Sequence, residues 1–187
     1  MASVFGHVAV GFTLARLHFR EREYWPYWLL ASALAFLPDA DVIGFKFHVP
    51  YASLWGHRGL THSLLAAAVI ALVVTVLVRL LTKPGRWRPG FGRLLSLLFL
   101  ATASHGVLDA MTSGGLGVAF LSPWELERYF FDFRPIKVSP IGIKNFLGQR
   151  GWQVLRSEII WVGIPCLLIL LLRTIFTYPA TAKLRQS

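Results

Sequence analysis

Apolar residues are concentrated in five stretches of the chain, and shorter polar segments separate these stretches. They cover residues 4–17, 27–44, 61–81, 94–112 and 158–177. The third and fifth are the strongest candidates for transmembrane helices. The other three contain His or Asp, and their uncharged runs are shorter than the ~20 residues of a full span. The pattern predicts an all-α, polytopic membrane protein with four or five transmembrane or re-entrant helices.

Two prolines fall inside apolar stretches. Pro38 and Pro165 are expected to end or kink their helices, because proline removes a backbone donor and its ring clashes with the preceding turn. We interpret residues 1–187 as a single membrane-embedded domain, a length that suits one domain.

The composition supports a membrane location. Apolar residues make up 55% of the chain and charged residues only 15%, whereas soluble domains carry about 25% charged residues. The net charge is +10, but the basic residues flank the apolar stretches, which is typical of membrane topology and lipid headgroups rather than of nucleic-acid binding. The single cysteine, Cys166, excludes an internal disulfide and a cysteine-based zinc site.

The basic residues also predict which helix ends face the cytoplasm. They gather in residues 16–22, in residues 79–93 and in the tail after residue 177. Cytoplasmic loops carry an excess of Lys and Arg, so these three regions are predicted to lie inside. Five alternating segments then place the N-terminus outside and the C-terminus inside. Residues 113–157 become a long outer-face loop that is rich in aromatic and basic residues.

This topology brings seven side chains that can bind a metal to the outer ends of four apolar stretches. They are His7, Asp39, Asp41, His57, His62, His105 and Asp109. Ionisable groups in or near a membrane are costly and usually mark function. Imidazole and carboxylate are the ligands that zinc accepts where thiolates are absent. The set is too large for one tetrahedral ion, so we expect one or two divalent ions, with zinc favoured.

Several of these residues are candidates for more than one role. Asp39 or Asp41 could bind the metal, orient another ligand or act as a catalytic base. Arg58 is a candidate catalytic and substrate-binding residue that could hold an anionic group or pair with an aspartate. In the outer loop, Arg134 and Lys137 are candidates for binding phosphate. Trp124 is a further substrate-binding candidate, expected at the membrane interface.

Each motif also has a structural explanation. His7 could be a buried packing residue, and the PDAD sequence could form a turn. Thr61 or Ser63 could cap a helix, and the i,i+4 pair His105 and Asp109 could form a simple hydrogen bond. Taken together, these explanations require seven coincidences on one side of the membrane, and for that reason we favour a metal site.

The order of the motifs resembles the YdjM-type inner-membrane, metal-dependent hydrolase family. The motifs are an early Gly-His, LPDAD, GHRGLTHSLL and SHGVLDAMTSGG. The resemblance implies a bacterial inner-membrane hydrolase and carries the seven residues into its metal site. Val42 stands where some family members have a histidine. A weaker similarity, to the zinc-dependent phospholipase C and P1 nuclease group, implies hydrolysis of phosphoric esters, but no histidine follows His105.

The function expected from these observations is hydrolysis of an ester by metal-activated water, with the site on the periplasmic side. A phosphoester of a membrane lipid or a lipid-linked substrate fits the location, and no nucleic-acid partner is expected. Two alternatives remain. The first is a metal-binding membrane protein without catalysis. The second is a small transporter, for which polar groups at the middle of the membrane would be expected.

Overall fold

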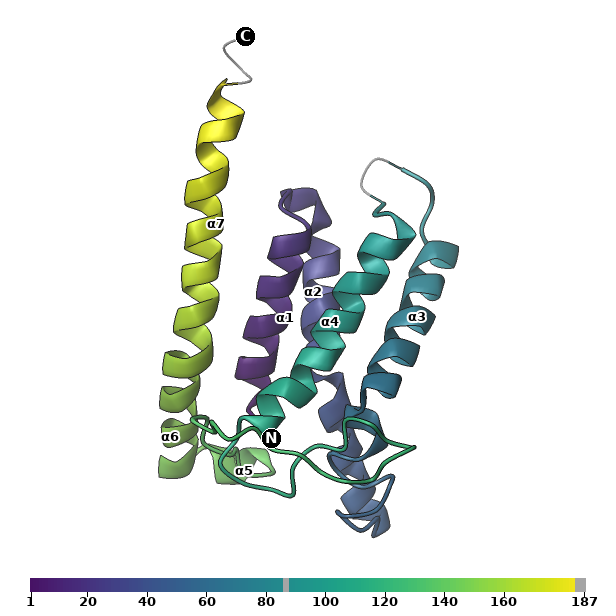
Figure 1. The fold of residues 1–187 in the computed structure, drawn as a ribbon, viewed down its shortest axis with the longest axis vertical. Helices are drawn as coiled ribbons and strands as arrows, with labels where there is room; N and C mark the ends of the chain where they lie inside the picture. Colours follow the sequence, from purple (N-terminus) through teal and green to yellow (C-terminus); the bar gives the residue numbers. More distant parts are fainter. Residues whose placement is uncertain (86–87, 184–187) are drawn as a thin grey trace.

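The computed structural model describes residues 1–85 and 88–183 and shows a helical bundle (Figure 1). Within the described residues there are helices and two isolated β-bridges but no strands, so the prediction of an all-α protein is confirmed. The long helices are α1 (Val4–His18), α2 (Trp25–Phe36), α3 (Leu64–Leu81), α4 (Phe91–Ala110) and α7 (Ile164–Lys183). Arg86 and Arg185, two of the basic residues behind the predicted topology, lie outside the described part of the chain.

Among the described residues, four segments are long and apolar enough to cross a membrane. They are Arg22–Phe47, Leu64–Leu81, Phe91–Ala110 and Gln149–Phe176. This confirms the polytopic membrane prediction. α1, with 15 residues, is shorter than these segments.

Helix α4 lies at the centre of the bundle and packs against α1, α2 and α3. Its buried leucines and the small residues of its neighbours form the main core: Ala15, Ala31, Ala35, Ala71, Leu94, Leu97, Leu98 and Ala101. Small residues allow membrane helices to approach closely. At Gly11, a Cβ atom would lie 2.8 Å from Ala35 Cβ. A side chain at this position would therefore push α1 and α2 apart.

Both prolines mark breaks in regular helix, as predicted. The α-helical part of α2 ends at Phe36, and the chain continues as a 3₁₀ segment, η2 (Leu37–Phe47), whose second residue is Pro38. Pro165 directly follows a π-helical turn, η4 (Ile159–Gly163), and the first residue of α7. Because Pro165 has no N–H group, a regular helical hydrogen bond cannot be made there.

The outer region is less loop-like than predicted. Residues 113–142 are loop, but they are followed by α5 (Ile143–Phe146) and α6 (Gln149–Glu158). The sequence prediction was wrong for α6 because its apolar face is short: the buried residues of this helix are Gly151, Val154 and Glu158. In Figure 1 these short helices and the loop lie together beneath one end of the bundle.

Glu158 connects this region to α1. Its carboxylate accepts hydrogen bonds from the backbone N–H and the side-chain hydroxyl of Ser3, which is the N-cap residue of α1. A carboxylate is favourable at the positive end of a helix dipole. The contact therefore fixes the start of α1, and with it the position of His7 one turn further along.

Candidate metal centre

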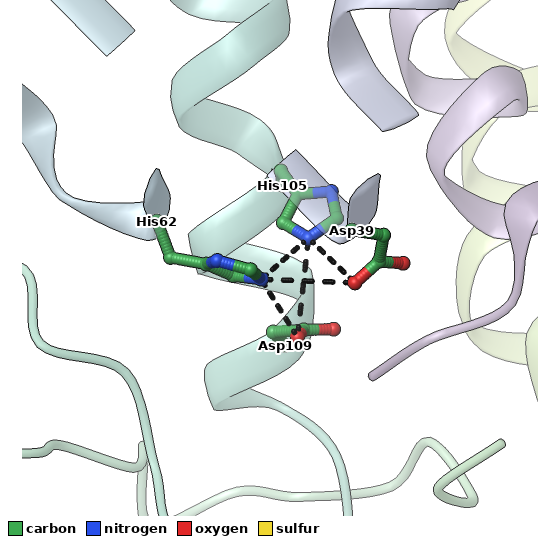
Figure 2. A group of neighbouring side chains, drawn as sticks. All are labelled: Asp39, His62, His105 and Asp109. Carbon is green, nitrogen blue, oxygen red and sulfur yellow. Dashed lines mark hydrogen bonds and ion pairs between the residues drawn. The ribbon is translucent and has the colours of Figure 1, made fainter. Parts of the chain in front are cut away.

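Four of the predicted ligands meet at the C-terminal end of α4. His105 and Asp109 come from α4 itself, Asp39 from η2, and His62 from the 3₁₀ turn η3 (Leu60–His62). Figure 2 shows the four side chains pointing toward one another. Their ligand atoms lie within 4.8 Å of one another, and all four residues are buried. We call this group the ligand cluster.

The distances in the ligand cluster suit a tetrahedral ion. His105 Nε2 lies 3.3 Å from Asp39 Oδ1 and 4.0 Å from Asp109 Oδ2. His62 Nε2 lies 3.7 Å from each of the same two oxygens. Four ligands at ~2.1 Å from a tetrahedral zinc ion lie ~3.4 Å from one another. The side chains are therefore already spaced for one ion among them.

The two imidazoles of the cluster each have one nitrogen fixed as a donor. His105 Nδ1 lies 2.8 Å from the backbone oxygen of Ala35, which can only accept a hydrogen bond. His62 Nδ1 lies 3.2 Å from Asp41 Oδ2. In neutral rings both Nε2 atoms then carry lone pairs, and they face each other at 3.0 Å. A proton or a metal ion must lie between them to avoid repulsion.

The carboxylates of the cluster differ in how their charge is met. Asp109 Oδ2 is ion-paired with Arg58 Nε at 2.9 Å, whereas both oxygens of Asp39 are buried without a hydrogen-bond partner among the described residues. A buried charge without a partner is strongly unfavourable. The donor set of two nitrogens and two carboxylate oxygens matches zinc and related divalent ions. The residues therefore fit the predicted metal.

Asp41 has different surroundings, although it is only two residues from Asp39. Its carboxylate contacts His57 Nδ1 at 2.6 Å, the Thr61 hydroxyl at 2.6 Å and the Arg58 backbone N–H at 3.3 Å, as well as His62 Nδ1. It therefore orients His62, an arrangement common behind metal-bound histidines. Asp41, His57 and Thr61 form what we call the support network.

The protonation of His62 depends on the ligand cluster and on the support network. Burial favours the neutral ring, but the neighbouring carboxylates of Asp39 and Asp41 outweigh this effect and raise the pKa of His62 to about 9. Without a metal ion, His62 therefore holds the proton that separates the two Nε2 atoms at neutral pH. A metal ion bound by the ligand cluster would have to replace this proton.

His7 lies on the other side of the two cluster carboxylates. Its ring stacks on His105 at a centroid distance of 3.8 Å and an angle of 13°. Its Nε2 lies 3.6 Å from Asp109 Oδ1 and 3.8 Å from Asp39 Oδ2. These are the carboxylate oxygens that do not face His62 and His105. His7 and these two oxygens are the residues that could hold a second ion, although Asp109 Oδ1 also accepts the Ala2 N–H at 2.6 Å.

Arg58 is buried behind Asp109. Its Nε lies 2.9 Å from Asp109 Oδ2, and its terminal nitrogens donate to Gly114 O and Thr112 Oγ1, each at 2.9 Å. Gly115 has a positive φ of 96°, and a Cβ there would lie 2.6 Å from the guanidinium. The glycines after α4 therefore make room for Arg58, a role that the sequence did not reveal.

His57 lies beside the ligand cluster. With Asp41 and His62 it forms a second group whose ligand atoms lie within 4.8 Å of one another. Its Nδ1, however, is bonded to Asp41, and its ring packs edge-on against Tyr51 at 5.3 Å. We interpret it as a residue that holds Asp41 in place.

The remaining predicted substrate contacts are on the surface of the outer loop. Trp124 is 78% exposed, the Arg134 guanidinium lies over the Phe130 ring, and Lys137 is exposed. Sequence reasoning missed Arg128, which donates to the backbone oxygens of His57, Tyr51 and Ser53 and so ties the two outer loops together. Its partners are backbone atoms, for which the sequence carries no signal.

Comparison with known proteins gives two matches. The YdjM inner membrane protein family matches residues 1–180. The inner membrane protein YbcI of Escherichia coli (strain K12) is 43% identical over 138 residues, which cover 73% of this chain and 76% of YbcI. No solved structure matches. The matched residues include the whole ligand cluster.

Proposed function

The chain belongs to the YdjM inner membrane protein family, and from this premise we propose that it is a membrane-bound, metal-dependent hydrolase. The protein is a multi-pass protein of the bacterial inner membrane. The observation that carries the proposal is the pair of imidazole Nε2 atoms 3.0 Å apart, with Asp39 and Asp109 oxygens beside them. The substrate class is an ester, with a phosphoester of a lipid favoured.

The ligand cluster would hold one divalent ion, and His7 with the opposite carboxylate oxygens supports a second. A bound ion of this kind lowers the pKa of its water toward ~7 and stabilises negative charge on a leaving oxygen. Asp41 is not available as a base because both its oxygens accept hydrogen bonds. Asp39 has no such partners among the described residues, but in this proposal its oxygens hold the ions, so Asp39 acts as a ligand rather than as a base.

Arg58 supports the centre through its charge. Its guanidinium is fully buried and contacts Asp109, so it offsets the negative charge of that carboxylate. Two carboxylates in one buried site repel each other, and a neighbouring cation reduces this cost. We assign Arg58 to the positioning of Asp109 rather than to direct contact with substrate.

A lipid substrate is supported by an apolar cavity of about 420 Å³ beside the centre. It lies between the start of α1 and α5, and Val4, Phe5, Phe146 and Leu147 are among its lining residues. Met1 also lines it, and the next residue, Ala2, donates its N–H to Asp109 Oδ1 at 2.6 Å. An apolar chain in this cavity would therefore end close to the cluster. The basic residues at the opposite helix ends favour a periplasmic position for the centre.

A second candidate is a metal-binding membrane protein without catalysis. The observation in its favour is the burial of the cluster: His105 and Asp109 are 0% exposed, Asp39 is 3% and His62 is 4%. Closed sites with four protein ligands are typical of structural zinc.

Metal analysis of the purified protein in detergent, combined with an activity screen, tests both candidates. We expect one or two zinc ions per chain in the wild type and in His18→Ala, whose histidine bonds to Leu14 O far from the centre. We expect loss of metal in His105→Ala. Hydrolysis of lipid phosphoesters that disappears with the metal supports the hydrolase. Bound metal without turnover supports the second candidate, and no metal in chelator-free preparations contradicts both.

A further inference from the structure

A second polar site lies at the end of the bundle opposite the metal centre. There a cavity of about 90 Å³ separates the end of α1 from the middle of α7. Its lining consists of Arg16, Arg20, Leu170, Arg173 and Thr174. The two helices run side by side in Figure 1, and this end of α1 is the one farthest from α5 and α6. Three arginines thus face one small space.

The arginine from α1 is held in place by its neighbours. One terminal nitrogen of Arg16 donates to the backbone oxygen of Arg20 at 2.7 Å. Its guanidinium carbon lies 4.4 Å from the centre of the Trp28 ring. Together these contacts fix the orientation of the guanidinium. Arg16 is therefore not a loosely solvated surface cation.

Among the described residues, the charges of Arg16, Arg20 and Arg93 act on Arg173 in one direction, and that of Glu21, an exposed residue, acts in the opposite direction. Like charges repel more strongly beside apolar helices than in water, because the effective dielectric constant is lower. A bound anion would remove this repulsion.

An excess of basic residues on the cytoplasmic side is expected of any inner-membrane protein. That rule explains why arginines are frequent at this end of the helices. It does not explain why arginines from α1 and α7 line the same cavity. Guanidinium groups bind phosphate through paired hydrogen bonds. The cytoplasmic leaflet supplies anionic phospholipids, whose phosphates lie at the ends of membrane helices.

We propose that this cavity binds the phosphate headgroup of an anionic phospholipid. Arg16, Arg20 and Arg173 contact the phosphate, and the acyl chains lie along the exposed apolar residues of α7, among them Leu167 and Leu171. The lipid joins α7 to the C-terminal end of α1. At the other end of α1, the contact between Glu158 and Ser3 makes the corresponding connection. This site is independent of the metal centre and of the proposed hydrolase function.

Native mass spectrometry of the full chain in detergent tests the proposal. The protein is titrated with phosphatidylglycerol, with phosphatidylcholine and with inorganic phosphate. We expect wild type to prefer phosphatidylglycerol over phosphatidylcholine by about tenfold, because paired hydrogen bonds to a charged group are strong. We expect this preference to fall to about twofold or less in Arg16→Gln/Arg173→Gln. The matched control is Arg22→Gln, which changes an exposed arginine at the same end of the bundle. This variant should keep the preference for phosphatidylglycerol.

Three results would overturn the proposal. The first is equal binding of the two lipids by the wild type, which requires no variant. The second is the same preference in the double variant as in Arg22→Gln. The third is binding of inorganic phosphate as tight as that of phosphatidylglycerol, which would identify a free anion as the ligand. Arg16→Lys/Arg173→Lys, which keeps the charge, replaces the glutamine variant if the latter does not fold.

Discussion

The ligand cluster and the support network share one short segment, η2, but they differ in how their polar atoms are satisfied. In the support network, each oxygen of Asp41 accepts from a donor of His57, Thr61 or Arg58. In the ligand cluster, lone pairs and carboxylate oxygens face one another, and Asp39 has no hydrogen-bond donor among the described residues. The network thus has a donor for each oxygen of Asp41, whereas the cluster has none for Asp39 among the described residues.

This difference separates binding from positioning. In the proposed metal centre, a residue of the cluster would contribute a donor atom to the metal, so its loss would remove part of the binding site. A residue of the network only orients such a donor, so its loss leaves the donor atom in place with more freedom. The aspartates Asp39 and Asp41 allow a matched comparison, because they have the same chemistry and lie in the same segment.

The largest effect is expected for Asp39→Asn. Four ligands share roughly 10–16 kcal/mol of zinc binding energy, so loss of one should weaken binding about a hundredfold to a thousandfold. Competition with a coloured chelator measures the affinity. Asp132→Asn, which changes an exposed acid in the outer loop, serves as control and should bind like the wild type.

A smaller effect is expected for Asp41→Asn. Loss of a partner behind a metal-bound histidine usually costs about tenfold to a hundredfold in affinity. The same chelator assay should show this loss with unchanged stoichiometry. If Asp41→Asn loses as much affinity as Asp39→Asn, or if the order of the two is reversed, the division between cluster and network is wrong.

Metal affinity should also depend on pH through His62. Since the pKa of His62 is raised to about 9, a proton must leave the ring when zinc binds below that pH. Affinity should therefore rise about tenfold per pH unit as the pH approaches 9 and level off above it. Calorimetry in buffers of different ionisation enthalpy should show release of about one proton at pH 7. Binding that is independent of pH between 6 and 8 would contradict this assignment.

The smallest effect on metal binding is expected for Ser63→Ala. The Ser63 hydroxyl accepts the N–H of Ala66 and caps α3, and loss of such a cap costs about 1 kcal/mol of stability. Unfolding in detergent should show lower stability while zinc affinity stays within a few fold of wild type. Ser96→Ala, on the exposed side of α4 and without a capping role, should leave both unchanged.

Much of the fold could be predicted from the sequence, because apolar runs and prolines act locally. The run from Leu64 to Leu81 becomes α3, and Pro38 ends the α-helical part of α2. The gathering of His62, His105 and Asp109 with Asp39 could also be predicted, since alternating membrane helices bring every second connecting loop, with the helix ends on both sides of it, to the same face.

The division of roles within the site could not be predicted. Whether Asp39 or Asp41 faces the cluster depends on the rotation of η2 after Pro38, which the sequence does not fix. Arg58 reaches Asp109 because its backbone has a positive φ of 63°, a conformation that few non-glycine residues adopt. Glu158 lies far from Ser3 along the chain, and the packing of η4 and α7 against α1 brings them together.

The brevity of α1 has a consequence for the bilayer itself. A helix of 15 residues is about 22 Å long at ~1.5 Å per residue, whereas the hydrocarbon core of a bilayer is ~30 Å thick. Hydrophobic mismatch of this kind draws the lipid surface inward around the short helix. Headgroups and water are then brought toward His7 in its first turn. If α1 lies in the bilayer, we expect that acyl-chain length in the surrounding membrane changes the depth of the candidate metal centre.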